Sequence, residues 1–546
     1  MSATTDALDA LIADYVLMVN SAGEGFTVPR DPSAPRVAMA ADALVSDFLY
    51  RLDREHGIDA YSRTDAVRSW LDTRLTISTA GRLRVPVALR AHQVVDDDTG
   101  APRLLIDLGD PEVGFFIDVR AGGWTLFDPR VPGADERYPV DERPVFTRPS
   151  TDFRALPIPR RGEVRGEGRD WLRGALNLSE RDWRLVWGWM LTAYFSQWDR
   201  QGLLFVAPTK VGKTLRAGMV LRFIQPSDPH ADGIGADFPE SQREWGSLIA
   251  GNAVLAFDDV ERISDKAHGN LKRIVTGVAF KTQTLYKTSG LTVTRGKRPL
   301  VLTASGTPSG LRDDLRNRLW LVEPTAPPVG DRLRSTFEHM APAIFADLLD
   351  DLADALALYL PAEGELARQI SETGVGVRPL EVTALFRALD RAQGLDPSAG
   401  FEQAARDALQ DSLMEAASGD RFAYTVRVFL SGHPDGGVLS SQDLLAGLAE
   451  TARELFPDSH PEREDWFPKD ATRMGTFFTK KADSLNEAGV YLAKRMPDRN
   501  TRGWAWEPIP EDLRVYAPTA PAPVRLPVRT SDSDLSGPAF PDEPKG

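Results

Sequence analysis

The stretch LLFVAPTKVGKTLRAGMVLRFI, residues 203–224, decides the fold of this protein. Residues 203–206 are an apolar run that predicts a buried strand, and the residues after Thr214 have the apolar spacing of an amphipathic helix. The loop between them, APTKVGKT, fits a phosphate-binding pattern. A loop of this spacing before a helix wraps backbone N–H groups around a triphosphate, where the helix dipole favours anions.

Each part of this loop has a physical role. Gly212 lets the backbone approach the phosphates, Lys213 reaches the β- and γ-phosphates, and Thr214 offers a hydroxyl to Mg²⁺. Ala207 stands where the first glycine is usual, at no cost if its φ is negative. A chance match would not explain the strand before the loop and the helix after it. We therefore predict that ATP is bound by Ala207, Pro208, Thr209, Lys210, Val211, Gly212, Lys213 and Thr214.

Two later apolar runs end in polar residues. The run AVLAF, 253–257, precedes Asp258 and Asp259, and we expect Asp258 to orient Mg²⁺ and Asp259 to polarise the attacking water, with Glu261 as the alternative for that second role. The run PLVLTAS, 299–305, offers Ser305, or alternatively Thr303, as a sensor of the γ-phosphate. Parallel strands bring such tips to one edge of an open α/β sheet, so a shared ligand crevice is predicted.

The segment DDLRNRLWLVE, 313–323, places two arginines ahead of another apolar run. Arg318 is predicted to reach the triphosphate of a neighbouring subunit and to stabilise transition-state charge. The alternative is an ordinary surface pairing of Arg316 and Arg318 with Asp313 and Asp314.

A basic β-hairpin is predicted over 282–298, TQTLYKTSGLTVTRGKR, with its turn near residues 288–290. In a ring, such a hairpin would point into the pore and grip a phosphate backbone. The alternative is a solvated basic turn. The candidate DNA contacts are Lys281, Lys287, Arg295, Lys297 and Arg298.

Composition excludes several classes of protein. The chain has 546 residues, a net charge of −14, no cysteine and seven scattered histidines, so disulfides and thiolate metal sites are excluded and no structural metal is expected. The acidic start lacks the features of a signal peptide, and no apolar stretch is long enough to span a bilayer. We expect a cytoplasmic protein without a membrane partner, whose DNA contacts are local.

The region before residue 160 divides into two patterns. Helical spacing covers 7–19, 41–52 and 65–75, and short β runs between 84 and 147 predict a meander. Asp96–Asp98 could suggest a polymerase metal site, but the following Thr-Gly favours a hairpin turn. Further on, Ser179 is predicted to cap a helix as a capping box with Asp182.

Tryptophans 183, 187 and 198 lie on or just beyond the helix that Ser179 opens, where they are expected in the core rather than stacked on bases. Helices are also predicted over 341–360 and 404–414.

The C-terminal third holds a second basic region. Helical runs at 441–455 and 470–488, followed by a basic ribbon, predict a winged helix. Across 466–506 there are eight basic and four acidic residues, which favours a phosphate-facing surface, although a protein-docking role is the alternative. Residues 511–546 are expected to be disordered. The candidate DNA contacts here are Lys480, Lys481, Lys494 and Arg495.

Together the motifs APTKVGKT, VLAFDD, LKRIVTG (271–277), PLVLTAS and LRNRLWLVE resemble helicase superfamily 3, and more closely the ATPase half of phage and plasmid primase–helicase proteins. In that family these regions supply the phosphate loop, the acidic pair, the DNA-gripping hairpin, the sensor and the arginine finger. Residues 104–128 and 466–490 also look like the accompanying β domain and C-terminal module. The likeness spans about two thirds of the chain. Asp259 replaces the usual Glu and Ser305 the usual Asn.

The resemblance implies an α/β protein with an AAA+-like P-loop core, assembled as a ring, that translocates on single-stranded or forked DNA with ATP and Mg²⁺. The polymerase-type primase domain of larger relatives is expected to be absent, so a separate primase is a candidate partner. The expected parts are an N-terminal helical and β-meander domain, an ATPase, a helical connector, a winged helix and a tail, over residues 1–160, 165–335, 336–415, 416–510 and 511–546. The alternatives are a DNA-binding loader or switch that does not unwind DNA, and a scaffold with a degenerate nucleotide site.

Overall fold

The computed structural model divides into two compact units, Met1–Pro361 with Glu381–Ala405, and Ala362–Leu380 with Arg406–Gly546. Each unit is described separately. The structure describes residues 3–21, 23–59, 61–77, 84–96, 99–139, 142–148, 153–226, 237–283, 291–324, 326–328, 333–360, 379–409, 421–456, 460–464, 466–482, 485, 490–498 and 501–509.

The first unit begins with a small module of helices and a three-stranded sheet. Its sheet has the order β2-β1-β3. The predicted helix over 7–19 is wrong beyond Ile12, because residues 15–20, YVLMVN, form strand β1 and pair antiparallel with β2. Aromatic and β-branched side chains suit a strand, and this pairing overrides the helical spacing. The elements are α1 (Ala3–Ile12), β1 (Tyr15–Asn20), β2 (Gly25–Pro29), α2 (Ala41–His56), η1 (Tyr61–Arg63), α3 (Thr64–Ile77) and β3 (Arg84–Val85).

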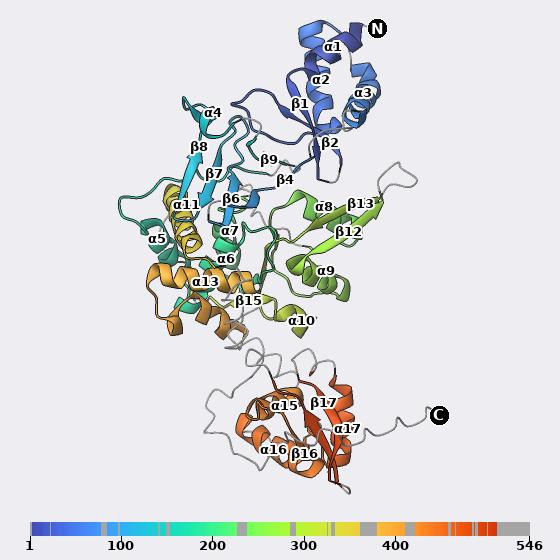
Figure 1. Ribbon diagram of the computed structural model, residues 1–546, viewed down its shortest axis with the longest axis vertical. Coiled ribbons are helices and arrows are strands. Elements are labelled where there is room, and N and C mark those ends of the chain that lie inside the picture. The colour runs from blue at the N-terminus through green and yellow to red at the C-terminus, as the bar shows by residue number, and fades with distance from the viewer. Residues whose placement is uncertain are drawn as a thin grey trace. The chain divides into compact units, whose positions relative to one another are not determined.

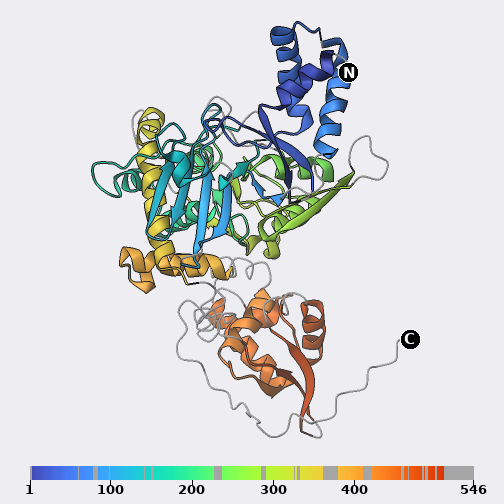
Figure 2. The same ribbon diagram turned by 45° about the horizontal axis from the view of Figure 1, so that its top comes forward.

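The predicted meander is confirmed as an antiparallel sheet of order β5-β6-β7-β8 (Figure 2). The Asp96 carboxylate accepts from the Thr99 backbone N–H at 3.1 Å, and the Asp96 carbonyl accepts from the Gly100 N–H at 2.8 Å. These bonds make the hairpin turn that the sequence favours over a metal site. The elements are β4 (Val87–Ala88), β5 (Ala91–Val95), β6 (Pro102–Asp107), β7 (Phe116–Arg120), β8 (Gly123–Phe127), α4 (Ala134–Arg137) and β9 (Val145–Phe146).

A four-stranded parallel sheet forms the centre of the first unit, so the chain is a mixed α/β protein. Its order is β11-β14-β10-β15. The register pairs Leu203 with Val301, and Ala256 also with Val301. The three apolar runs predicted as buried parallel strands are therefore confirmed, with β15 as a fourth. The strands are β10 (Gly202–Val206), β11 (Leu255–Phe257), β14 (Leu300–Ala304) and β15 (Leu319–Val322).

Helices follow the strands as crossover connections. A two-stranded hairpin, β12–β13, comes between α9 and β14 in the chain and lies beside α8 and α9 in Figure 1. The helices α8 and α9 pack against β11 and β14 through Trp245 of α8 and through Leu271 and Ile274 of α9. All three side chains are fully buried. The elements are α5 (Glu167–Leu176), α6 (Glu180–Thr192), α7 (Lys213–Leu221), α8 (Gln242–Gly251), α9 (Asp265–Thr276), β12 (Val278–Gln283), β13 (Leu291–Gly296), α10 (Asp313–Arg316), α11 (Leu333–Ala357), α13 (Leu380–Gln393) and η3 (Pro397–Ala399).

The tryptophans near α6 belong to the core, as predicted. Trp183, Trp187 and Trp198 are all buried, and the Trp187 indole N–H donates to Asp351 on α11 at 2.9 Å. The Ser179 hydroxyl accepts from the Asp182 N–H at 3.1 Å and so caps α6. These bonds fix α6 directly upstream of the strand that carries the phosphate loop.

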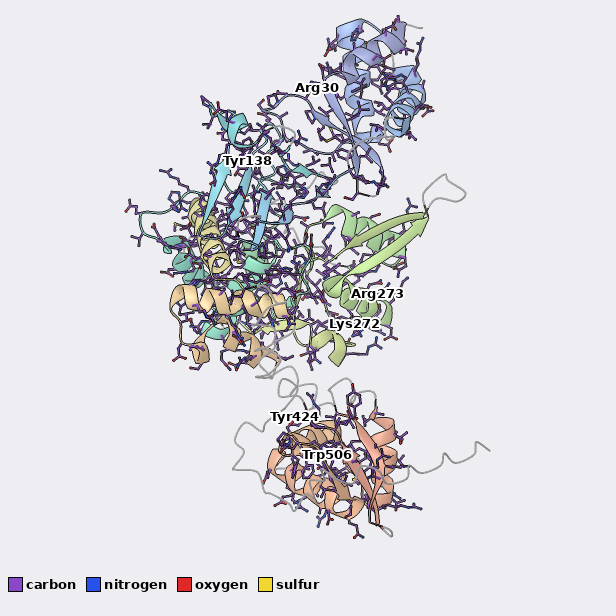
Figure 3. All side chains as sticks on the ribbon, in the orientation of Figure 1. Arg30, Tyr138, Lys272, Arg273, Tyr424 and Trp506 are labelled. Atoms are coloured by element: carbon purple, nitrogen blue, oxygen red, sulfur yellow. The ribbon has the colours of Figure 1, made fainter. Side chains whose placement is uncertain are left out.

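The second unit contains a three-stranded antiparallel sheet, order β16-β18-β17, covered by helices. Trp506 of β18, labelled in Figure 3, is buried in its core with Leu444 of α16 and Met474 of α17. The elements are α15 (Arg421–Ser431), β16 (Gly437–Ser440), α16 (Ser441–Leu455), η4 (Pro461–Arg463), α17 (Ala471–Lys480), β17 (Leu492–Asp498) and β18 (Thr501–Trp506). The predicted tail, 511–546, lies outside the described residues.

Two absences hold for the described part of the chain. None of its helices is both long and apolar enough to cross a bilayer. It also contains no group of three or more His, Asp or Glu side chains able to hold a metal ion.

Candidate nucleotide site

The loop after β10 has the conformation that an anion-binding loop needs. Gly212 has φ 82° and caps the N-terminus of α7, and a Cβ there would lie 2.7 Å from Pro328 Cδ. Glycine is therefore required both by the left-handed backbone and by close packing. Lys210 also has a positive φ, 72°. Ala207 is not among the described residues with positive φ, which is the condition under which an alanine can replace the usual glycine at this position. The loop therefore leads into the N-terminus of a helix, where an anion is favoured.

The three strand ends that the sequence singled out meet at one edge of the sheet. The Thr214 hydroxyl donates to both oxygens of the Asp258 carboxylate, at 2.9 and 3.0 Å. The Lys213 ammonium donates to Ser305 Oγ at 3.2 Å, and Ser305 Oγ donates to Asp259 Oδ1 at 3.1 Å. Residues up to 92 positions apart therefore form one polar cluster beside the phosphate loop.

Asp259 has a backbone conformation that explains its residue type. Its φ is 49°, in the left-handed region, which Asp and Asn enter more readily than longer side chains. This turn directs its carboxylate to Ser305 rather than along the strand. Glu261, the alternative for the second acidic role, is exposed, and its backbone carbonyl accepts from the Ser309 N–H at 2.9 Å.

Thr303 has a role that its sequence position did not reveal. It is fully buried, donates its hydroxyl to Asp258 Oδ1, and accepts from the Asp259 N–H at 2.9 Å. One hydroxyl therefore orients the first carboxylate and fixes the turn that carries the second. Ser305, two residues further, lies at the exposed tip of the strand. The only sequence signal for Thr303 is a polar residue inside an apolar strand.

Replacing Thr303 by Val keeps the shape but removes both hydrogen bonds. The Asp259 N–H is then left without its acceptor, which is expected to cost about 1–3 kcal/mol in the free energy of unfolding. Asp258 loses an orienting donor, so we expect Mg²⁺ to be needed at about 10- to 100-fold higher concentration for ATP turnover. Urea unfolding and Mg²⁺ titration of turnover measure the two effects. Thr303→Ser, which keeps the hydroxyl, should behave like the wild type in both.

Arg216 supports the loop from behind and was missed by the sequence analysis. Its guanidinium is fully buried and donates to three carbonyls, of Leu176 at 2.7 Å, Val211 at 2.5 Å and Ala326 at 2.5 Å. Burial lowers the pKa of Arg216 to about 10, so the group remains cationic at neutral pH. The hydrogen bonds of Arg216 connect the phosphate loop to the last residue of α5 and to the segment after β15.

The oxygens at the site suit a magnesium ion. Mg²⁺ prefers hard oxygen ligands and is held in phosphate-transfer sites by one or two protein oxygens together with the phosphates. The Thr214 hydroxyl and the Asp258 carboxylate supply such oxygens side by side. The residues present therefore fit the Mg²⁺–ATP complex that the sequence predicts.

Arg318 lies at the end of the sheet where the parallel strands begin. Its own phosphate loop lies at the other end, where the strands finish. The Gly202 N–H at the start of β10 donates to the Arg318 carbonyl at 2.8 Å, and Gly202 pairs with Leu319. The loop starts at Ala207, beyond the other end of β10, roughly 15–20 Å away along the strand at about 3.3 Å per residue. Arg316 ends α10, just before it. The side chains of Asp313 and Asp314, their alternative partners, are outside the described part.

The predicted hairpin is confirmed as the antiparallel pair β12–β13, with Val278 opposite Gly296 (Figure 1). Its turn and Lys287 lie outside the described residues, as do the side chains of Lys281 and Arg295.

Two of the predicted DNA contacts at the hairpin are already engaged within the chain. Lys297 forms an ion pair with Asp199 at 2.6 Å. The Arg298 guanidinium donates to the carbonyls of Ile249 at 3.1 Å and Asn252 at 2.8 Å, and burial lowers its pKa to about 10. Both cationic groups therefore have partners within the chain, and their assignment as DNA contacts stays a prediction.

The four predicted DNA contacts of the second unit lie at the C-terminal end of α17 and on β17. Lys480 and Lys494 are exposed, whereas Lys481 and Arg495 are partly buried. The Lys494 ammonium lies 6.0 Å from the centre of the Trp504 ring. These residues lie on or next to the helix and the strand that the sequence predicted for them.

Comparison with known proteins gives distant structural likenesses only. No family model matches the chain, and no curated protein matches it. The solved structures that resemble it include the following three. "SCCmec type IV Cch - active helicase" is 10% identical, with a TM-score of 0.39, over 91% of this chain and 93% of that one. The apo structure of the NrS-1 C-terminal region is 7% identical, with a TM-score of 0.32, over 93% and 100%.

The third structure is a full-length MCM homologue from Methanopyrus kandleri, 13% identical, with a TM-score of 0.30, over 70% of this chain and 92% of that one. Likeness at this level assigns no activity to the chain, so the chemistry has to follow from the site itself.

Proposed function

We propose that this protein is an ATP-dependent DNA helicase or translocase of helicase superfamily 3, with an AAA+-like core, acting as a ring in replication of a phage or mobile element. The observation that carries this proposal is the polar cluster formed by Lys213, Thr214, Asp258, Asp259 and Ser305 at one edge of a parallel sheet. A scaffold with a degenerate site would not need five side chains, from α7 and from the residues that follow β11 and β14, to converge.

The cluster gives each side chain a distinct task in ATP hydrolysis. Loop N–H groups and Lys213 would hold the triphosphate, and Thr214 with Asp258 would hold Mg²⁺, which neutralises phosphate charge when bound. Asp259 Oδ1 would accept a proton from the attacking water, a task for which its exposed turn suits it. Ser305, bonded to both Lys213 and Asp259, would sense the γ-phosphate.

The position of Arg318 supports action between subunits. The backbone of Arg318 is separated from its own loop by the length of β10. In a ring, the end of the sheet that carries Arg318 would face the nucleotide site of a neighbouring copy, where an arginine stabilises transition-state charge. The proposed nucleotide site is therefore completed by a second copy of the chain.

DNA contact is proposed for two places, the hairpin and the second unit. On the hairpin, Lys281, Lys287 and Arg295 are the leading candidates, because Lys297 and Arg298 already have partners within the chain. In the second unit, the helix–strand order α15, β16, α16, α17, β17, β18 and the sheet order β16-β18-β17 support a winged helix. The five-part domain division from the sequence is kept as part of this proposal.

Within the proposed winged helix, charge favours α17 rather than α16 as the helix that faces DNA. The exposed face of α17 carries hydroxyls and cations, namely Thr472, Arg473, Thr476, Thr479 and Lys480. The exposed residues of α16 include three acids, Asp443, Glu450 and Glu454, and one cation, Arg453, so this surface is acidic on balance. Phosphates repel the second surface and attract the first.

We expect the double variant Arg473→Glu/Lys480→Glu to weaken binding to duplex DNA and to reduce the slope of log affinity against log salt by about two, one for each cation that no longer neutralises a phosphate. Fluorescence anisotropy over a salt series measures this. Arg453→Glu, the same change on α16, is the matched control. An unchanged slope in the double variant would favour the protein-docking role instead.

Strand displacement on a forked DNA tests the function as a whole. If the protein is a helicase, DNA should stimulate ATP hydrolysis and one strand of the fork should be displaced. Stimulated hydrolysis without displacement would favour a loader or regulatory switch. Absent hydrolysis in the wild type would favour the scaffold.

A further inference from the structure

Lys297 lies across the base of the β12–β13 hairpin. It directly follows Gly296, which pairs with Val278, so Lys297 stands opposite Gly277. Gly277 has φ 100°, and a Cβ there would lie 3.1 Å from Lys297 Cε. The aliphatic part of Lys297 is therefore packed over Gly277, the residue that directly precedes β12.

The ammonium of Lys297 reaches the segment that leads into the phosphate-loop strand. It pairs with Asp199 Oδ1 at 2.6 Å and donates to the Gln197 carbonyl at 2.7 Å. Both residues lie between α6 and β10, and β10 runs directly into the phosphate loop. The Lys297 side chain therefore joins the base of the hairpin to the segment before β10, the strand that leads into the proposed nucleotide-binding loop.

The next residue, Arg298, anchors the hairpin in a different way. Its guanidinium bonds the carbonyls of Ile249 and Asn252 at the end of α8, and its N–H donates to the Ile274 carbonyl at 3.2 Å. This anchor is largely buried, so breaking it would leave several carbonyls unpaired. It acts as a fixed point at the junction of the hairpin and β14.

The ion pair, by contrast, can open at little cost. The side chains of Lys297 and Asp199 are 27% and 45% exposed, and ion pairs exposed to this degree contribute about 0–1 kcal/mol to stability. Loss of this pair would leave the base of the hairpin anchored through Arg298, so the pair contributes more to the position of the hairpin than to stability.

We propose that the Lys297–Asp199 ion pair is a positioning link that couples the nucleotide state of the phosphate loop to the hairpin, so that DNA on the hairpin accelerates ATP turnover. This inference rests on the proposed function. It assigns Lys297 to the coupling of the two sites and not to DNA contact, and it gives Asp199, which no motif marks, the same role.

Two single variants and a charge swap test the link in the full-length protein. Lys297→Met and Asp199→Asn should each leave DNA-independent ATP turnover and the melting temperature unchanged, while stimulation by single-stranded DNA falls about fivefold or more, the low end of coupling between sites. The swap Lys297→Asp/Asp199→Lys should recover much of the stimulation. Asp128→Asn, which opens the exposed Asp128–Arg130 pair, is the matched control.

The Asp199 variant separates coupling from direct DNA binding. If Lys297 only contacted phosphate, removal of the nearby negative charge at Asp199 would leave or strengthen DNA binding and stimulation. Undiminished stimulation in Asp199→Asn, or no recovery in the swap, would overturn the link while leaving the helicase proposal intact. A wild type whose turnover DNA does not stimulate would overturn both.

Discussion

Replacing Lys213 by Ala is expected to abolish ATP turnover, with a fall of about a thousandfold, as for loss of a charged group aimed at the reacting centre. Lys213 is 7% exposed and, in the described structure, bonds Ser305 at the mouth of the loop. Its removal leaves the loop amides in place but takes away the cation that reaches the outer phosphates. Turnover at saturating Mg²⁺ and a titration with a fluorescent nucleotide measure the loss.

The matched control is Lys266→Ala. This lysine lies in the first turn of α9 and donates to the Glu240 carbonyl, so the substitution removes the same charge from outside the site. It should retain turnover and nucleotide affinity. If Lys213→Ala bound nucleotide as tightly as the wild type, the assignment of the phosphate loop would be wrong.

The second large effect is expected at Arg318. Arg318→Ala should reduce turnover by about 10³- to 10⁵-fold, the range measured for arginine fingers, and should spare nucleotide binding. The physical reason is its backbone position at the end of the sheet opposite its own loop, which favours the proposed action on the triphosphate of a neighbouring copy. Single-turnover hydrolysis and nucleotide affinity separate the two quantities.

Mixing two inactive variants tests action in trans. Arg318→Ala and Asp259→Asn subunits, each inactive alone, should regain part of the turnover when mixed, because some interfaces then combine an intact arginine with an intact acid. Arg316→Ala, the neighbouring arginine at the end of α10, is the control and should stay active. No recovery on mixing, with Arg318→Ala inactive, would place the residue's effect within its own subunit.

The helices and strands around the central parallel sheet were largely predictable, because their signals are local. Apolar runs at 203–206, 253–257 and 299–305 gave β10, β11 and β14 within two residues, and glycine at 212 fits a left-handed backbone that few other residues adopt. The miss at β1 has a local cause as well. Residues 15–20 satisfy helical spacing, but their strand partner, β2, is a non-local contact that spacing does not contain.

Thr303 and Ser305 show where sequence reasoning stops. Both face the same side of a strand by alternation, so either could serve as the sensor. The structure distinguishes them, since Thr303 is enclosed between Asp258 and the Asp259 N–H, while Ser305 lies one residue beyond the end of β14 and reaches Lys213. Similarly, the charge of Lys297 and Arg298 suggested DNA, whereas their partners, Asp199 and the end of α8, are about 50 to 100 residues away in the chain.

The sequence by itself determined the phosphate loop, the acids that follow a buried strand and the existence of the basic hairpin, because each depends on neighbours within a few residues. Three features were decided by the tertiary structure alone. They are the strand order β11-β14-β10-β15, the three hydrogen bonds that Arg216 donates to backbone carbonyls, and the partner of each charged side chain at the hairpin base. The reason is that a side chain's partner depends on which distant strands lie adjacent and in which register, and packing of the whole core sets both.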